Sequence, residues 1–69
     1  LYPNPASDRL FFETDLNIVQ IKIIDLTGKK VLEKNNPGNN VLVKALSEGV
    51  YFIQFNIENG VITKRFIKK

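Results

Sequence analysis

The chain has 69 residues, of which 43% are hydrophobic, and its ten Lys and Arg against seven Asp and Glu give a formal net charge of +3. A chain of this length buries only about 60% of the surface that it exposes when unfolded, so we expect one small domain of modest stability. It contains no cysteine and no histidine, which excludes disulfides, thiol and imidazole catalysis and the usual zinc sites.

The N-terminal stretch predicts a rigid, non-helical start followed by a short strand. Pro3 and Pro5 fix their own φ and push the residue before each toward extended conformations. Residues 9–13 then have the pattern of a short strand, with Leu10 and Phe12 turned inward.

A second, stronger strand is predicted over residues 18–26. Its apolar residues alternate with others at period 2, which favours a strand with one buried face. The residues expected on that face are Val19, Ile21 and Ile23.

The residues after this strand predict a tight turn and a return strand. Residues 25–28 read Asp-Leu-Thr-Gly, the composition of a type I turn that ends on a left-handed glycine, with Asp25 able to cap the turn amides. The return strand covers residues 29–34, and the Asn-, Pro- and Gly-rich stretch 35–40 is a loop.

The strongest strand signal in the chain is residues 49–57. A short strand at 41–43 and a tight connection plugged by Leu46 precede it. Strict alternation and many β-branched and aromatic residues make 49–57 the expected central strand. Its inward face carries Tyr51, Ile53, Phe55 and Ile57.

The dipeptide Asn59-Gly60 between two apolar runs predicts a two-residue type I′ hairpin. The last strand is then 61–67, with Glu58 opposite Val61. In that register Ile53 faces Phe66 and Phe55 faces Lys64 on the inner side, while Phe52 and Ile67 form an apolar pair on the outer face.

Six or seven short strands at intervals of roughly 8–12 residues predict an all-β antiparallel sandwich, with a small barrel as the alternative. We expect a single domain over 1–69, excised from a larger protein. The acidic residues fall at turns or strand ends, and Gly28-Lys29 lacks the strand and helix of a phosphate loop. No cofactor, metal or catalytic site is therefore expected.

The basic C-terminal residues, Lys64, Arg65, Lys68 and Lys69, are interpreted as solvated edge and tail positions and not as a nucleic-acid footprint. The aromatic residues are assigned mainly to the core, which again disfavours nucleic-acid binding.

Four features together resemble the type A C-terminal sorting domain of the type IX secretion system of the Bacteroidota. They are Tyr2-Pro3-Asn4-Pro5, Asp25-Leu26-Thr27-Gly28-Lys29, Leu46-Ser47-Glu48-Gly49-Val50-Tyr51 and the basic ending Lys64-Arg65-Phe66-Ile67-Lys68-Lys69. The resemblance covers the whole chain.

This resemblance implies an Ig-like β-sandwich that directs a cargo protein, fused upstream, from the periplasm through the outer membrane. The implied partners are the translocon and the outer-membrane shuttle and sortase proteins, and the cargo ends on the cell surface or released. The residues that match the family's motifs, or that we assign to recognition, are Tyr2, Pro3, Asn4, Pro5, Gly28, Lys29, Gly49, Tyr51, Ile67, Lys68 and Lys69.

Recognition is expected mainly at the last strand and its basic end, where edge amides could accept a partner strand or a second copy in a weak dimer. The alternative function is a non-catalytic carbohydrate- or surface-binding module. It is weakened by the absence of Trp and by the presence of only two Tyr, since glycan platforms favour such rings.

Overall fold

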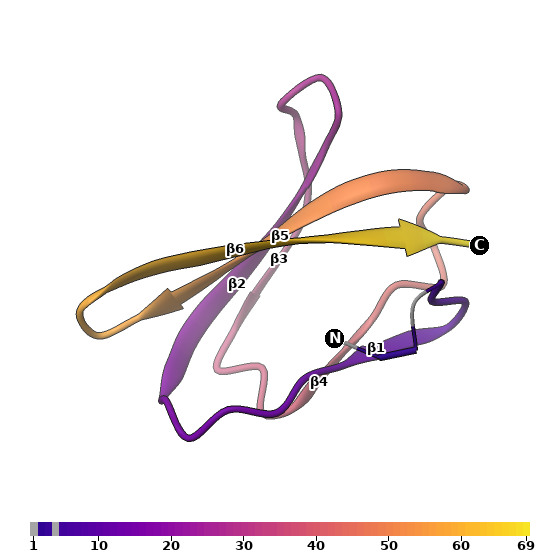
Figure 1. The fold of residues 1–69 in the computed structure, drawn as a ribbon. Coiled ribbons are helices and arrows are strands. Elements are labelled where there is room, and N and C mark those ends of the chain that lie inside the picture. Colours follow the sequence, from indigo (N-terminus) through magenta and orange to yellow (C-terminus); the bar gives the residue numbers. More distant parts are fainter. Residues whose placement is uncertain (1, 4) are drawn as a thin grey trace.

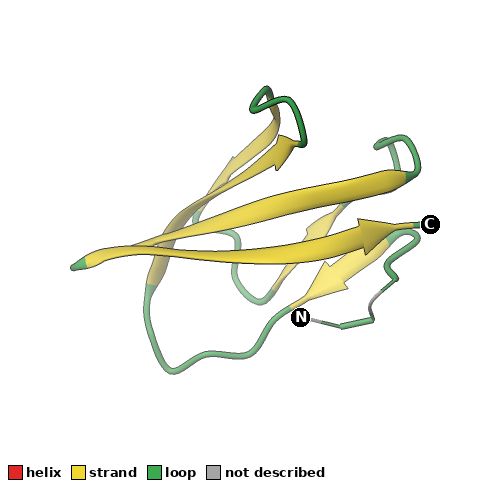
Figure 2. Cartoon of the chain, turned by 45° about the horizontal axis from the view of Figure 1, so that its top comes forward, coloured by secondary structure: helices red, strands yellow, loops and turns green. Residues whose placement is uncertain are grey.

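The computed structural model describes residues 2, 3 and 5–69, and these residues form strands, turns and loops (Figure 2). No helix that could span a membrane occurs among them. The strands are β1 (Arg9–Phe11), β2 (Ile18–Asp25), β3 (Lys30–Asn35), β4 (Asn40–Leu42), β5 (Gly49–Ile57) and β6 (Gly60–Lys68). They confirm the predicted all-β class and fall close to the predicted ranges.

The strands form two antiparallel sheets. One has four strands in the order β3-β2-β5-β6, and the other pairs β1 with β4. The small sheet lies across one face of the large one (Figure 1). Because side chains alternate between the faces of a strand, every second residue points into the space between the sheets. The buried core is made of Ala6, Leu10, Phe12, Ile18, Ile21, Ile23, Val41, Val43, Tyr51, Ile53, Phe55 and Phe66.

The core confirms most of the predicted inward positions, including Leu10, Phe12 and Tyr51, and Leu46 packs against it as expected. The prediction for Val19 is wrong, because 44% of this side chain is exposed. The pairing between β2 and β5 shifts register between Ile18 and Gln20. Such a bulge reverses the alternation for the residues on its far side, so Ile18 is buried in place of Val19.

The β5–β6 hairpin has the predicted faces but a different register. Ile57 pairs with Gly60, so Glu58 and Asn59 form the turn. The predicted type I′ turn is wrong, since it needs positive φ at both central residues. Among the described residues, Asn36 is the one non-glycine residue with positive φ.

The shift of register changes every predicted partner in this hairpin. Ile53 lies opposite Lys64, Phe55 opposite Ile62 and Tyr51 opposite Phe66. On the outer face Phe52 meets Arg65 and Val50 meets Ile67, so the expected Phe52–Ile67 pair is not formed. The slip is two residues, which keeps each side chain on its predicted face.

The turn between β2 and β3 is capped by Asp25 as predicted. The backbone N–H of Gly28 donates to the Asp25 carbonyl at 3.0 Å, and Gly28 has φ of 89°, in the left-handed region. Asp25 Oδ1 accepts hydrogen bonds from the Thr27 N–H at 2.9 Å, the Thr27 hydroxyl at 2.6 Å and the Lys29 N–H at 3.0 Å. One carboxylate therefore holds the whole turn.

We expect the stabilising effect of Asp25 to depend on pH. The hydrogen bond from the Thr27 hydroxyl, followed by that from the Lys29 amide, lowers the pKa of Asp25 below its ordinary value of 3.8. The stabilisation is therefore complete above about pH 3.8 and is lost as the pH falls through the lowered folded-state pKa. The melting temperature of Asp25→Ala should be lower than that of the native chain at neutral pH. The difference between the two melting temperatures should disappear at low pH.

The matched control for this prediction is Asp15→Ala. Asp15 is exposed, and no hydrogen bond to its carboxylate occurs among the described residues. A gap between native chain and Asp25→Ala that stays constant from neutral to acidic pH would contradict the assigned role of the carboxylate.

Candidate recognition surface

The two ends of the described chain are hydrogen-bonded to each other. The Ala6 N–H donates to the Ile67 carbonyl at 2.8 Å, and the Lys69 N–H donates to the Ala6 carbonyl at 2.7 Å. This is a parallel bridge beside β6. Ala6 is fully buried, so its small side chain sits inside the core while its backbone extends the sheet. We call Pro5, Ala6, Ile67, Lys68 and Lys69 the joined ends.

Lys68 is buried within the joined ends. Only 7% of the residue is exposed, and its Nζ donates to the Lys69 carbonyl at 2.9 Å. The expectation of a solvated position is therefore wrong for Lys68, although Lys64, Arg65 and Lys69 are exposed. Lys68 shares the inward face of β6 with Phe66, and its hydrogen bond compensates part of the cost of burying an ammonium group.

Tyr51 fixes the start of β5 against the loop that precedes it. Its hydroxyl donates to the Ser47 carbonyl at 2.7 Å, and its ring stacks on Phe66 with centroids 5.7 Å apart. A tyrosine that bonds back to the backbone a few residues upstream resembles the tyrosine corner of Ig-like sandwiches. Because Gly49 pairs with Lys68, the start of β5 adjoins the joined ends.

A model of the family described as the secretion system C-terminal sorting domain matches residues 1–69. The chain belongs to this family. No curated protein and no solved structure gives a significant match. The sorting domain is a signal for type IX secretion and interacts with that machinery, which exports its substrates through the outer membrane to the surface or the medium.

The sorting domain brings together the motif residues from its two ends. Gly49 pairs with Lys68, and Pro5 precedes the bridging Ala6 beside Ile67 and Lys69. Alternation of apolar residues could not predict the role of Ala6, because a bridge made by one residue produces no repeating pattern in the sequence. The signal that could have found it is a small apolar residue placed between the prolines and the first strand.

The other motif residues of the sorting domain lie apart from the joined ends. Gly28 and Lys29 occupy the β2–β3 turn. Tyr2 exchanges two backbone hydrogen bonds with Phe11, at 3.0 and 2.7 Å, and their rings stack at 5.8 Å, with Pro3 following on the surface. Asn4 lies outside the described residues.

The charged and polar groups of these surfaces can be surveyed from the described residues. In the described part of the sorting domain no three Asp or Glu residues come close enough to hold a metal ion. The hydroxyl of Thr27 lowers the pKa of the Asp25 carboxyl, and this carboxylate is used by its own turn. The joined ends present backbone, apolar and cationic groups, which suit recognition by another protein.

Proposed function

We propose that this single domain is the folded, non-catalytic sorting signal of a cargo protein that precedes it in the same chain. The cargo crosses the inner membrane with its own signal peptide, and the domain then engages the translocon and the outer-membrane shuttle and sortase proteins. The cargo is finally attached to the cell surface or released. The family match over residues 1–69 supports this route.

The observation that carries the proposal is the bridge between the joined ends. Ala6 and Lys69 are linked at 2.7 Å, so the segment that follows the cargo and the last strand form one surface. A partner that binds there contacts both ends of the sorting domain, and it can do so only when the domain is folded. We propose that Ile67, Lys68 and Lys69 act in recognition mainly through this folded arrangement.

A fluorescent reporter with a signal peptide and this chain tests the proposal. Expressed in a host with a type IX system, it should appear on the surface or in the medium. In a translocon-deficient strain it should stay in the periplasm. Periplasmic retention in both strains, with the tail folded, would overturn the proposal.

No second function is proposed, because the tyrosines do not form a glycan platform. Tyr2 stacks on Phe11 and Tyr51 is buried against Phe66. No planar pair of exposed tyrosine rings therefore occurs among the described residues.

A further inference from the structure

Among the described residues, the outer edge of β6 is covered only at its end. Ala6 bonds to the carbonyl of Ile67 and the amide of Lys69, which shows that odd-numbered residues of β6 direct their backbone groups away from β5. Because these directions alternate along an antiparallel strand, Val61, Thr63 and Arg65 also direct theirs outward. No described residue bonds to these outward groups. We call residues 61–65 the open edge.

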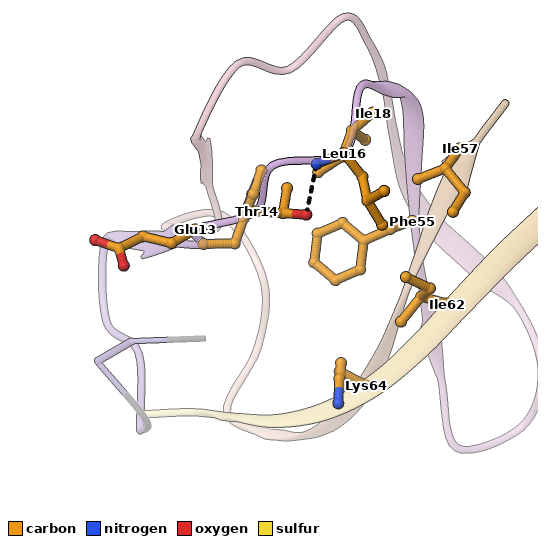
Figure 3. A pocket seen from close by; sticks show the side chains of 9 residues that line it. Glu13, Thr14, Leu16, Ile18, Phe55, Ile57, Ile62 and Lys64 are labelled. Carbon is orange, nitrogen blue, oxygen red and sulfur yellow. Dashed lines mark hydrogen bonds between the residues drawn. The ribbon is translucent and has the colours of Figure 1, made fainter.

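An apolar groove lies beside the open edge, on the inward side of the hairpin. It has a volume of about 150 Å³, and its apolar walls include Leu16, Ile18, Phe55, Ile57 and Ile62. The charged residues of its lining are Glu13 and Lys64, and the Glu13 carboxylate points away from the other side chains (Figure 3). Figure 3 shows Ile62 and Phe55 facing Leu16 across it, with Lys64 at the β6 side. Engineered cavities of about 150 Å³ accept benzene, so the groove has room for one branched or aromatic side chain.

Two cations lie on the open edge, and neither forms an ion pair with a described residue. Lys64 and Arg65 are exposed, and the one ion pair among the described residues joins Lys30 to Glu33 on β3. Because neighbouring residues of a strand face opposite sides, Lys64 points to the groove side and Arg65 to the outer side. The open edge therefore offers backbone hydrogen bonds, one apolar site and positive charge on both sides.

We propose that the open edge and groove bind an extended segment of a partner protein, which adds to the sheet as a fifth strand beside β6. An apolar side chain of this segment enters the groove near Ile62. An acidic side chain lies on the outer side near Arg65, three positions along the segment. This proposal rests on the proposed function, since it names the chemistry by which the export machinery reads the domain.

An extended segment fits because Ala6 already binds to the outer edge of β6, at the end of the strand. Its bonds of 2.8 and 2.7 Å to Ile67 and Lys69 are those of a strand beside β6. A longer segment in the same position would run along the open edge. Strand addition of this kind takes affinity from the backbone and specificity from alternate side chains. A second copy fits less well, because each copy would bring Lys64 and Arg65 to the same edge.

The variant Thr63→Pro tests this proposal. It removes one outward N–H and leaves the bonds to β5 intact, and proline is tolerated on edge strands at such positions. Glu33→Pro is the matched control. The Asn36 N–H donates to the Val19 carbonyl, so Val19, Ile21 and Ile23 direct their backbone groups toward β3. Leu32 and Lys34 lie opposite Ile23 and Ile21, and the Glu33 N–H between them therefore points away from β2. Thermal melts establish that both variants fold.

A library of random heptapeptides is then selected on the native 69-residue chain and on both variants. We expect selected peptides to carry an apolar residue and, three positions away, an acidic one. Binding should fall roughly tenfold or more in Thr63→Pro and stay within about twofold in Glu33→Pro. No enrichment over the Thr63→Pro chain would overturn the proposal.

Two further measurements separate the remaining outcomes. Sedimentation of the native chain that shows dimers lost in Thr63→Pro would make a second copy the occupant and overturn the proposal. In the reporter, export of Thr63→Pro at the native level would overturn strand addition while leaving the sorting function standing. Failure of the native reporter would instead remove the sorting function.

Discussion

Replacing Phe66 with alanine is expected to remove about a third or more of the free energy of unfolding of the chain. Phe66 is fully buried, lies opposite Tyr51 and stacks on its ring at 5.7 Å. Truncating such a residue costs about 3–5 kcal/mol. At roughly 0.05–0.15 kcal/mol per residue, the whole chain of 69 residues has a free energy of unfolding of only about 3–10 kcal/mol.

Thermal melting followed by circular dichroism measures this effect. The melting temperature should fall by more than about 12 °C, at roughly 4–8 °C per kcal/mol. Phe52→Ala is the matched control, because Phe52 is half-buried on the outer face of the same sheet and should lose about half of the 1.5–3 kcal/mol of full burial. Equal losses in the two variants would contradict a core confined to the inner face.

Removing Ile67, Lys68 and Lys69 is expected to reduce export of the reporter to the level of a translocon-deficient strain. The truncation removes both backbone partners of Ala6 and the pair between Lys68 and Gly49. The segment before β1 then loses its attachment to β6, and the joined ends no longer exist. Surface fluorescence measures the export, and hydrogen exchange at the Ala6 amide measures the release.

Lys69→Ala provides the control for this truncation. It removes the exposed ammonium group but keeps the Lys69 N–H that donates to Ala6. Because we assign recognition to the folded arrangement, this variant should retain most of its export. Native export by the truncated chain would show that the last three residues are dispensable and would contradict their assigned role.

Local patterns in the sequence predicted the strands and most of their faces. Period-2 alternation placed Tyr51, Ile53 and Phe55 inward because their burial is decided by the pleat, whatever the partner strand is. The Asp25 turn was also predictable, since a carboxylate that caps its own turn needs only neighbouring amides.

Register could not be predicted as well as the faces. A slip of two residues leaves the face of each side chain unchanged, so the alternation around Phe55 fits opposite Lys64 and opposite Ile62 equally well. The choice depends on the turn, where Gly60 pairs with Ile57 in place of occupying the turn itself. The bulge at Val19 could not be predicted for a related reason, because it arises from the pairing of β2 with β5 and not from the residues of β2 alone.

The joined ends were the least predictable part of the site. The motifs at the start and end of the chain were each recognised, but their contact depends on Ala6 reaching Ile67 and Lys69 across the sequence. The burial of Lys68 follows from the same contact and not from its charge. Resemblance thus identified the family, whereas the geometry of its two ends needed the structure.

The parallel direction of the Ala6 bridge has a mechanical consequence. A pull on the chain before residue 2, with β6 held at its end, drives the two segments past each other along their length. The bonds of 2.8 and 2.7 Å between them are then loaded together in shear, and neither can open first as in a zipper. Traction during passage through a membrane pore would therefore meet the two bonds between Tyr2 and Phe11 first, and then this bridge, before it separated the two sheets.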